Sequence, residues 1–386
     1  MSTLYRQWIF VLCIGVMFFS LVKTGCATNN PLSFNEAMFS QAEPPSHQVE
    51  SLNKQIKSLS QKSEVVNQQT ATGSQKTQAE NQQVATNLKT QIENQQTGTA
   101  NQKTDSSSET IPNIQTGNTK LIKGIYISQE TAEDTKYFTY LIGRAKKVGI
   151  NTFIVDLELP SKKYAQNMQL LKDNGINYIA RIIVFPGGGT KEQVASIPIR
   201  EKKLRLAKTA ISYGASQIQL DYIRYNTKQV PSHKNSETIA GLIAWFKDNI
   251  NVPLQVDVFG ISSYGESKYI GQNIKLIGES AHVICPMVYP SHYEPYKVHA
   301  VTPYETVYGS LMALRNQYNN APLPFKLIPY IELSNYRYQL SHAKKMDYIY
   351  AQIRAAENAN ADGWYVWSPR NLYDNLFYVL ETKKVR

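Results

Sequence analysis

Two short stretches of sequence decide the fold: residues 217–223 read QIQLDYI, and residues 253–260 read PLQVDVFG. Each is an apolar run of strand length that contains an aspartate near its end, Asp221 in the first and Asp257 in the second. The segment between them, 238–250, has apolar residues at helical spacing. A strand, a helix and a second strand in this order are typical of a βα unit around a parallel sheet.

The same alternation extends over the chain from residue 120 onwards. Six further strands are expected at 121–127, 152–158, 178–185, 281–290, 325–332 and 363–369. Further helices are expected at 137–148, 202–213, 306–318 and 346–358. Eight strands, with no glycine-rich nucleotide loop after the first, favour a closed (β/α)8 TIM barrel over a doubly wound sheet. We therefore assign residues 120–386 to one α/β barrel domain.

The N-terminal part of the chain has a different composition. An apolar run at 8–22 is typical of a secretory signal peptide, so residues 1–27 are interpreted as a signal peptide or N-terminal anchor. Lipidation of Cys26 is an alternative to simple cleavage, although Lys23 stands where a lipobox has an aliphatic residue. Residues 28–119 are rich in Gln, Asn, Ser and Thr and predict a disordered linker. Together these segments predict an exported protein that is periplasmic, envelope-associated or secreted.

The charge and the Cys and His content indicate which partners and cofactors to expect. The formal net charge is +11, but Lys and Arg are scattered without a basic run, so nucleic acid is not expected as a partner. Membrane contact is expected only through the N-terminal anchor or a lipid. Cys285 is the one cysteine of the expected barrel, and the six histidines lack metal-ligand spacing. We expect a monomer without a metal or cofactor.

Acidic residues stand at the ends of four expected strands, where a βα barrel builds its active site. They are Asp156 and Glu158 on the second strand, Asp221 on the fourth, Asp257 on the fifth and Glu332 on the seventh. One such residue alone is equally typical of a helix cap or an ion pair. Several on one rim suit glycoside hydrolysis, which needs one protonated and one ionised carboxyl group. We predict Asp221 as nucleophile or base and Asp257 as proton donor, with Glu332 as the alternative donor.

Other residues at the strand ends suit sugar binding. Arg224 follows Asp221 by three residues and is expected to orient its carboxylate, the alternative being an ordinary rim salt bridge. Aromatic side chains stack on the apolar faces of sugars while polar groups bond to the hydroxyls. The predicted substrate-binding residues are Asp156, Glu158, Arg224, Tyr289, His292, Tyr330 and Trp367.

A series of strings resembles a bacterial family of barrel domains that is classed among glycoside hydrolases and has no assigned activity. The strings, in chain order, are IARIIVF from Ile179, IQLDYIRY from Ile218, DVFG from Asp257, IGQ from Ile270, PMVYPSHY from Pro286, Pro303-Tyr304 and QIRAAENANADGWYVW from Gln352. The resemblance spans about residues 123–373. It implies a TIM barrel related to glycosidases, and by motif position it points to Asp221, Arg224, Asp257, Tyr289 and His292 as site residues.

The chain departs from the family pattern in two places. The segment between the third and fourth strands is short, and the family's PW-Q near the seventh strand is replaced by residues 329–332, PYIE. Both departures imply a reshaped substrate groove.

Three functional hypotheses follow. The first is a glycoside hydrolase that acts on an envelope or extracellular polysaccharide, or on oligosaccharides from it. The second is a non-catalytic carbohydrate-binding barrel tethered at the cell envelope by the linker. The third, which has less support, is a scaffold for protein interactions.

Overall fold

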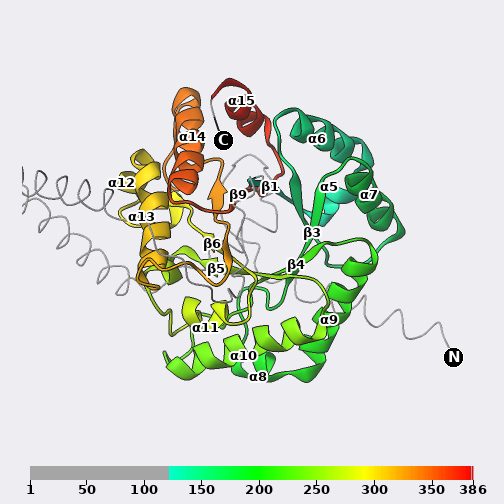
Figure 1. The fold of residues 1–386 in the computed structure, drawn as a ribbon, viewed down its shortest axis with the longest axis vertical. Coiled ribbons are helices and arrows are strands. Elements are labelled where there is room, and N and C mark those ends of the chain that lie inside the picture. Colours follow the sequence, from blue (N-terminus) through cyan, green and yellow to red (C-terminus); the bar gives the residue numbers. More distant parts are fainter. Residues whose placement is uncertain (1–120, 384, 386) are drawn as a thin grey trace, which may run out of the picture. The chain divides into compact units, whose positions relative to one another are not determined.

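The computed structural model describes residues 121–383 and 385, which form a closed parallel sheet surrounded by helices (Figure 1). The predicted (β/α)8 barrel is therefore confirmed. The signal peptide expected at 1–27 and the linker expected at 28–119 lie outside the described residues. Within the described part of the chain, no helix has the length and apolar character needed to cross a membrane.

All eight expected strands are present, and every pairing between neighbours is parallel. The seventh is divided into two short strands at Pro329, which has no N–H to donate to the sheet. The pairing of β5 with β6 and of β9 with β1 closes the barrel. The strands are β1 Ile122–Ile127, β2 Thr152–Asp156, β3 Asn177–Ile183, β4 Gln217–Asp221, β5 Leu254–Phe259, β6 Val283–Met287, β7 Lys326–Leu327, β8 Tyr330–Glu332 and β9 Gly363–Trp367.

Helices connect the strands and cover the outside of the barrel (Figure 1). Several begin at a side-chain cap: Ser161 accepts a hydrogen bond from the first turn of α7, and Thr190 forms a capping box with Gln193 in α8. The helices are α5 Gln129–Glu133, α6 Thr135–Lys147, α7 Lys162–Asp173, α8 Lys191–Ala195, α9 Ile197–Ser212, α10 His233–Asn249, α11 Ile274–Gly278, α12 Tyr296–Val301, α13 Pro303–Asn316, α14 His342–Asn358 and α15 Asp374–Thr382, with 3-10 turns η1 Gly260–Tyr264 and η2 Pro290–His292.

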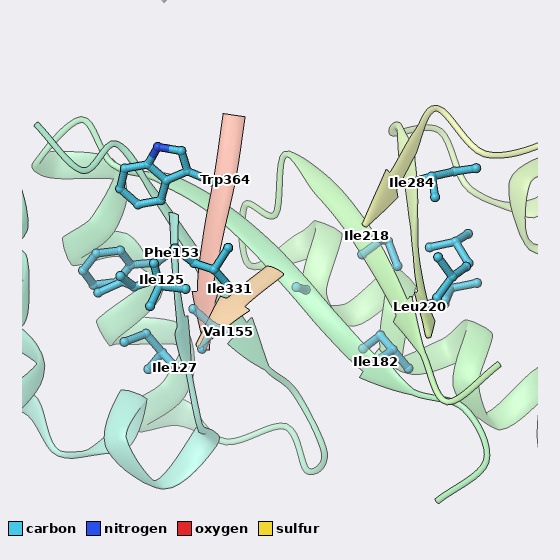
Figure 2. Packing of buried hydrophobic residues seen from close by; sticks show 14 of the residues in the cluster. Ile125, Ile127, Phe153, Val155, Ile182, Ile218, Leu220, Ile284, Ile331 and Trp364 are labelled. Atoms are coloured by element: carbon cyan, nitrogen blue, oxygen red, sulfur yellow. The ribbon is translucent and has the colours of Figure 1, made fainter. Parts of the chain in front are cut away.

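Strand alternation divides the buried side chains into two sets. The outer core lies between the strands and the helices, and Figure 2 shows two parts of it, one around Trp364 and Phe153 and the other around Ile218 and Leu220. Trp364 and Phe153 are completely buried, and burial of a side chain of Phe size contributes about 1.5–3 kcal/mol to stability. The outer core therefore holds the helices against the barrel.

The inner core fills the barrel itself and consists of Tyr126, Ile154, Ile179, Val283, Cys285, Met287, Tyr289, Ile328, Tyr330 and Tyr365. Gly124 makes room for it, because a Cβ at this position would lie 2.5 Å from the ring of Tyr365. Hydrogen bonds join Tyr330 of the inner core to two buried glutamines of neighbouring strands. Tyr330 donates to Gln219 at 2.8 Å, and Gln219 donates to Gln255 at 3.0 Å. This bonded layer forms the floor beneath the C-terminal ends of the strands.

Candidate active site

Four charged side chains meet inside the C-terminal mouth of the barrel. Asp156, Arg181, Asp221 and Asp257 end or nearly end β2, β3, β4 and β5, and they are only 4%, 8%, 4% and 1% exposed. Period-two alternation explains why they point inwards, since Ile154 and Ile179, two residues before the first two, belong to the inner core. The structure thus brings together three of the five acidic residues predicted from strand ends.

Arg181 lies at the centre of these carboxyl groups. Its Nη1 is 2.5 Å from Asp156 Oδ1, and its Nε donates to Asp221 Oδ2 at 3.1 Å. Nη2 donates to the same Asp221 oxygen. Asp257 Oδ2 lies 3.7 Å from Nε, a longer contact than the other two. Because both oxygens contact Nε, Asp221 Oδ2 and Asp257 Oδ2 lie no more than about 7 Å apart, which is close enough for the two carboxyl groups to flank one sugar.

Each aspartate has a different set of additional partners. The Tyr126 hydroxyl donates to Asp156 Oδ2 at 2.6 Å, and the backbone N–H of Tyr222 donates to Asp221 Oδ1 at 2.5 Å. Asp257 Oδ1 is buried and has no hydrogen-bond partner. Asp257 is consequently the carboxyl group with the least support for a negative charge.

Asp257 and Asp156 also differ in how their surroundings act on the pKa. Burial raises the pKa of Asp257 well above its ordinary value, and the nearby charge of Asp221 raises it further. Burial also raises the pKa of Asp156, although the guanidinium of Arg181 and the Tyr126 hydroxyl act in the opposite direction. Asp257 is the member of the group best suited to hold a proton.

Tyr222 immediately follows β4 and has a backbone φ of 52°, in the left-handed region that a non-glycine residue seldom adopts. This conformation aims its N–H at the side chain of Asp221. Such a backbone costs of order 1–3 kcal/mol and is concentrated at functional sites. The strain is therefore a second, independent mark of this strand end.

Arg224 does not perform the role predicted for it. Within the described residues no ion pair joins it to Asp221, and Arg181 occupies that place. The Arg224 guanidinium lies 4.5 Å from the centre of the Phe259 ring, and its Nη1 donates to the Tyr225 carbonyl at 2.9 Å. The glycine turn at Gly188 packs directly on it, since a Cβ there would lie 2.5 Å from Nη1. Nε and Nη2 are buried without partners.

Glu332 is buried at the mouth, and both its carboxyl oxygens accept hydrogen bonds from neighbouring segments. Its Oε1 accepts hydrogen bonds from the Ser291 N–H at 2.9 Å and from the Tyr348 hydroxyl, and its Oε2 accepts from the Ser291 hydroxyl at 2.6 Å. Burial raises its pKa to about 7, while the bonds from Ser291 and Tyr348 lower it in part. Both oxygens thus hold the turn η2 against β8 and α14.

The predicted aromatic residues occupy three different environments. Tyr289 is 2% exposed and stacks on half-buried Trp367 with ring centres 5.8 Å apart. His292 is exposed, and its ring lies 5.1 Å from that of Tyr289. Tyr330 points into the barrel floor rather than the mouth. Trp367 and His292 are consequently the two members of this set that are accessible at the mouth.

Glu158 lies outside the aspartate group. Strand β2 ends at Asp156, and the chain then turns so that Glu158 is exposed, with its backbone N–H donating to Gln129 Oε1 at 2.8 Å. Its charge acts on Lys203 of α9.

Arg181 is the residue that sequence reasoning missed. The predicted site residues are acidic and aromatic residues at strand ends, whereas Arg181 stands within the apolar string IARII. The signal was present, because Arg181 is two residues from both Ile179 and Ile183 and so lies on the same face of the strand. It must face the barrel interior if Ile179 does.

The opposite end of the barrel is hollowed. A cavity of about 1080 Å³ lies at the N-terminal ends of the strands, lined among others by Gln217, Pro253, Lys326 and Asp362. These residues start or precede strands, so the cavity is separated from the aspartates by the inner core.

Comparison with protein families decides the classification. Residues 192–373 match the family model described as "Putative glycosyl hydrolase domain". The matched segment, just under half of the chain, is similar to that family. It includes Asp221, Asp257 and Glu332, whereas Asp156 and Arg181 precede the match. Its end agrees with the resemblance identified in the sequence, and its start lies further along the chain.

Solved structures show the same fold as the barrel of this chain. The spore cortex-lytic enzyme SleL of Bacillus cereus is 12% identical, with a TM-score of 0.50, over 69% of this chain and 75% of that one. The endo-1,4-beta-mannanase of Rhizomucor miehei is 10% identical, with a TM-score of 0.50, over 68% of this chain and 93% of that one. No curated protein matches the sequence.

Proposed function

We propose that the barrel domain cleaves O-glycosidic bonds of an envelope or extracellular polysaccharide, with Asp221 and Asp257 as the catalytic residues. One observation carries the assignment: an oxygen of each carboxyl group contacts the same guanidinium nitrogen, Arg181 Nε. Two carboxyl groups that are close together but differently supported are what glycoside hydrolysis requires.

The different surroundings assign the roles. Asp257, buried with an unpartnered Oδ1, gives its proton to the leaving glycosidic oxygen. Asp221, which receives three N–H donors, acts as the carboxylate that attacks the anomeric carbon or removes a proton from the attacking water. Glu332 is less suited to be the donor because both its oxygens already accept hydrogen bonds from the surrounding loops.

Substrate contacts are proposed for the groups around the pair. Trp367 offers a half-buried indole for stacking on a sugar ring, and Tyr289 supports it from behind. Export to the envelope or beyond is supported by the sequence pattern at 1–27.

The test is hydrolysis of a panel of envelope and extracellular polysaccharides by the purified protein. We expect wild type to release reducing ends and Asp221→Asn to lose at least about 1,000-fold in kcat, as removal of a catalytic residue commonly does. Asp173→Asn, at an exposed aspartate at the end of α7, is the matched control and should keep full activity. Full activity in Asp221→Asn would eliminate the assignment.

Asp257→Asn separates the two roles. A missing proton donor slows substrates with poor leaving groups most, because an acidic phenol leaves without help. We therefore expect Asp257→Asn to lose far more activity on the polysaccharide than on its aryl glycoside.

A second function, non-catalytic carbohydrate binding, is favoured by one specific observation. Asp221 and Asp257 are only 4% and 1% exposed, which limits access by a substrate. This function predicts saturable binding without product, weakened by Trp367→Ala. Product formation by wild type that Asp221→Asn abolishes would rule it out.

A further inference from the structure

Arg181 is a buried cation that contacts three carboxyl groups from three other strands. The contacts are unequal: 2.5 Å to Asp156, 3.1 Å and a second N–H bond to Asp221, and 3.7 Å to Asp257. The guanidinium also lies over the Tyr126 ring, 5.3 Å from its centre. A planar fork with five donors suits this task, because several carboxyl oxygens are held from fixed directions.

The charge balance of this group restricts its protonation. Three ionised aspartates around the guanidinium of Arg181 would leave an excess of negative charge in a buried place, which is unfavourable. The buried guanidinium of Arg224 also acts on Asp221, but it forms no ion pair with any of the three and offsets this excess only in part. One added proton reduces the excess further. The carboxyl group that accepts it at least cost is Asp257, since it has the longest contact and an oxygen without a donor.

The same contacts also fix the direction of Asp221. Arg181 Nε and Nη2 both donate to Asp221 Oδ2, while the Tyr222 N–H donates to Asp221 Oδ1. Rotation of the carboxylate would break at least one of these bonds. Arg181 therefore acts on Asp221 in two ways, by its charge and by its geometry.

We propose that Arg181 is a positioning residue, which keeps Asp221 ionised and oriented and leaves the proton of the group to Asp257. Arg181 contacts the two reacting carboxyl groups and need not touch the sugar. The inference rests on the proposed function for its catalytic consequence, whereas its charge-setting part is measurable without any substrate.

The substrate-free test is unfolding in urea at pH 5 and pH 8 for wild type and Arg181→Met. Loss of the cation leaves the aspartates without compensation, and this matters more at pH 8, where they would be ionised. We expect Arg181→Met to lower the urea midpoint more at pH 8 than at pH 5. Arg144→Met, which breaks the more exposed ion pair with Glu381, is the matched control and should shift the midpoint little at either pH.

Two further variants keep the test decisive if Arg181→Met does not fold. Arg181→Lys retains the charge without the fork, and the double variant Asp156→Asn with Arg181→Met removes one acid together with the base. The lysine variant should restore most of the pH 8 stability. The charge-setting role would be overturned if Arg181→Met and the double variant each lost as much stability at pH 5 as at pH 8. If Arg181→Met is unfolded, the same result in the double variant alone would overturn it.

The catalytic part is tested on the polysaccharide that wild type hydrolyses. Misplacement of a catalytic group by about 1 Å costs about 100-fold in rate, so Arg181→Lys should lose about that factor in kcat with little change in KM. In Arg181→Met, the acidic limb of the pH–rate profile should move to higher pH than in wild type, because the cation beside the reacting carboxylate is lost. An unchanged profile and kcat in these variants would contradict the positioning role. If wild type hydrolyses nothing, the proposed function fails, while the unfolding measurements still decide the charge-setting role.

Discussion

Glu332 illustrates how one buried carboxyl group makes stability depend on pH. Its pKa of about 7 lies above the 4.5 of an unperturbed glutamate, so the folded protein binds this proton more tightly than the unfolded chain does. Its contribution to stability is therefore complete below pH 4.5 and is lost as the pH rises towards 7. In wild type, this titration lowers the unfolding free energy by about 3 kcal/mol over this interval. We expect Glu332→Gln to abolish that decrease, because the amide does not titrate.

The amide is nearly isosteric and can still accept the Ser291 N–H, so the local structure should persist. Urea unfolding between pH 4.5 and 7.5 is the measurement, and Glu130→Gln, at an exposed position in α5, is the control. Asp156 and Asp257 contribute with the same sign, so some slope should remain in the variant. Parallel curves for wild type and Glu332→Gln would refute this account of Glu332.

At the level of single residues, prediction succeeded where backbone alternation alone decides orientation. Asp156, Asp221 and Asp257 meet because each stands near the C-terminal end of a strand and faces inwards. It failed for Arg224, whose chain has already left the strand and packs on Phe259. It also failed for Glu158, because β2 ends two residues earlier. Side-chain direction after a strand end depends on the loop, which alternation does not describe.

Among the elements, the strands were predicted more accurately than the starts of the helices. Helix α10 begins at His233, five residues before the apolar periodicity begins at 238, and α9 begins at Ile197 rather than 202. Their first turns carry few core-facing residues, so periodicity misses them. Ser196 and Ser232 cap these helices, and the cap residues were the signal to use.

Gly124 of β1 offers a test of how the barrel is filled. A methyl group there would lie 2.5 Å from the Tyr365 ring and 2.8 Å from Ile154, both in the inner core. Overpacking of this kind costs about 1–3 kcal/mol, so Gly124→Ala should lower the unfolding free energy by that amount. Gly143→Ala is the matched control, because Gly143 is at an exposed position of helix α6 and nothing lies within 4 Å of the added carbon.

In Gly143→Ala the helix should gain about 0.5–1 kcal/mol, since alanine has the higher helix propensity. Chemical denaturation of both variants gives the comparison. Equal stability of Gly124→Ala and wild type would mean that the inner core is looser than described.

For the whole molecule, the two ends of the barrel differ in character. The C-terminal mouth holds the charged group around Arg181, and the N-terminal end holds a cavity of about 1080 Å³. Strand order and periodicity predicted the mouth, because barrel topology gathers strand ends there. The cavity could not be predicted, because it depends on how the segments before β6 and β7 pack against each other. The periodicity of apolar residues gives no information about such packing.

In the proposed function, a glycan binds at the C-terminal mouth with its scissile bond between Asp221 and Asp257. The most direct measurement is a crystal structure of Asp221→Asn with the oligosaccharide that wild type cleaves. We predict the glycosidic oxygen within hydrogen-bond distance of Asp257 and a sugar ring against Trp367. An oligosaccharide in the N-terminal cavity, or at the mouth with its scissile bond away from both carboxyl groups, would contradict the claim.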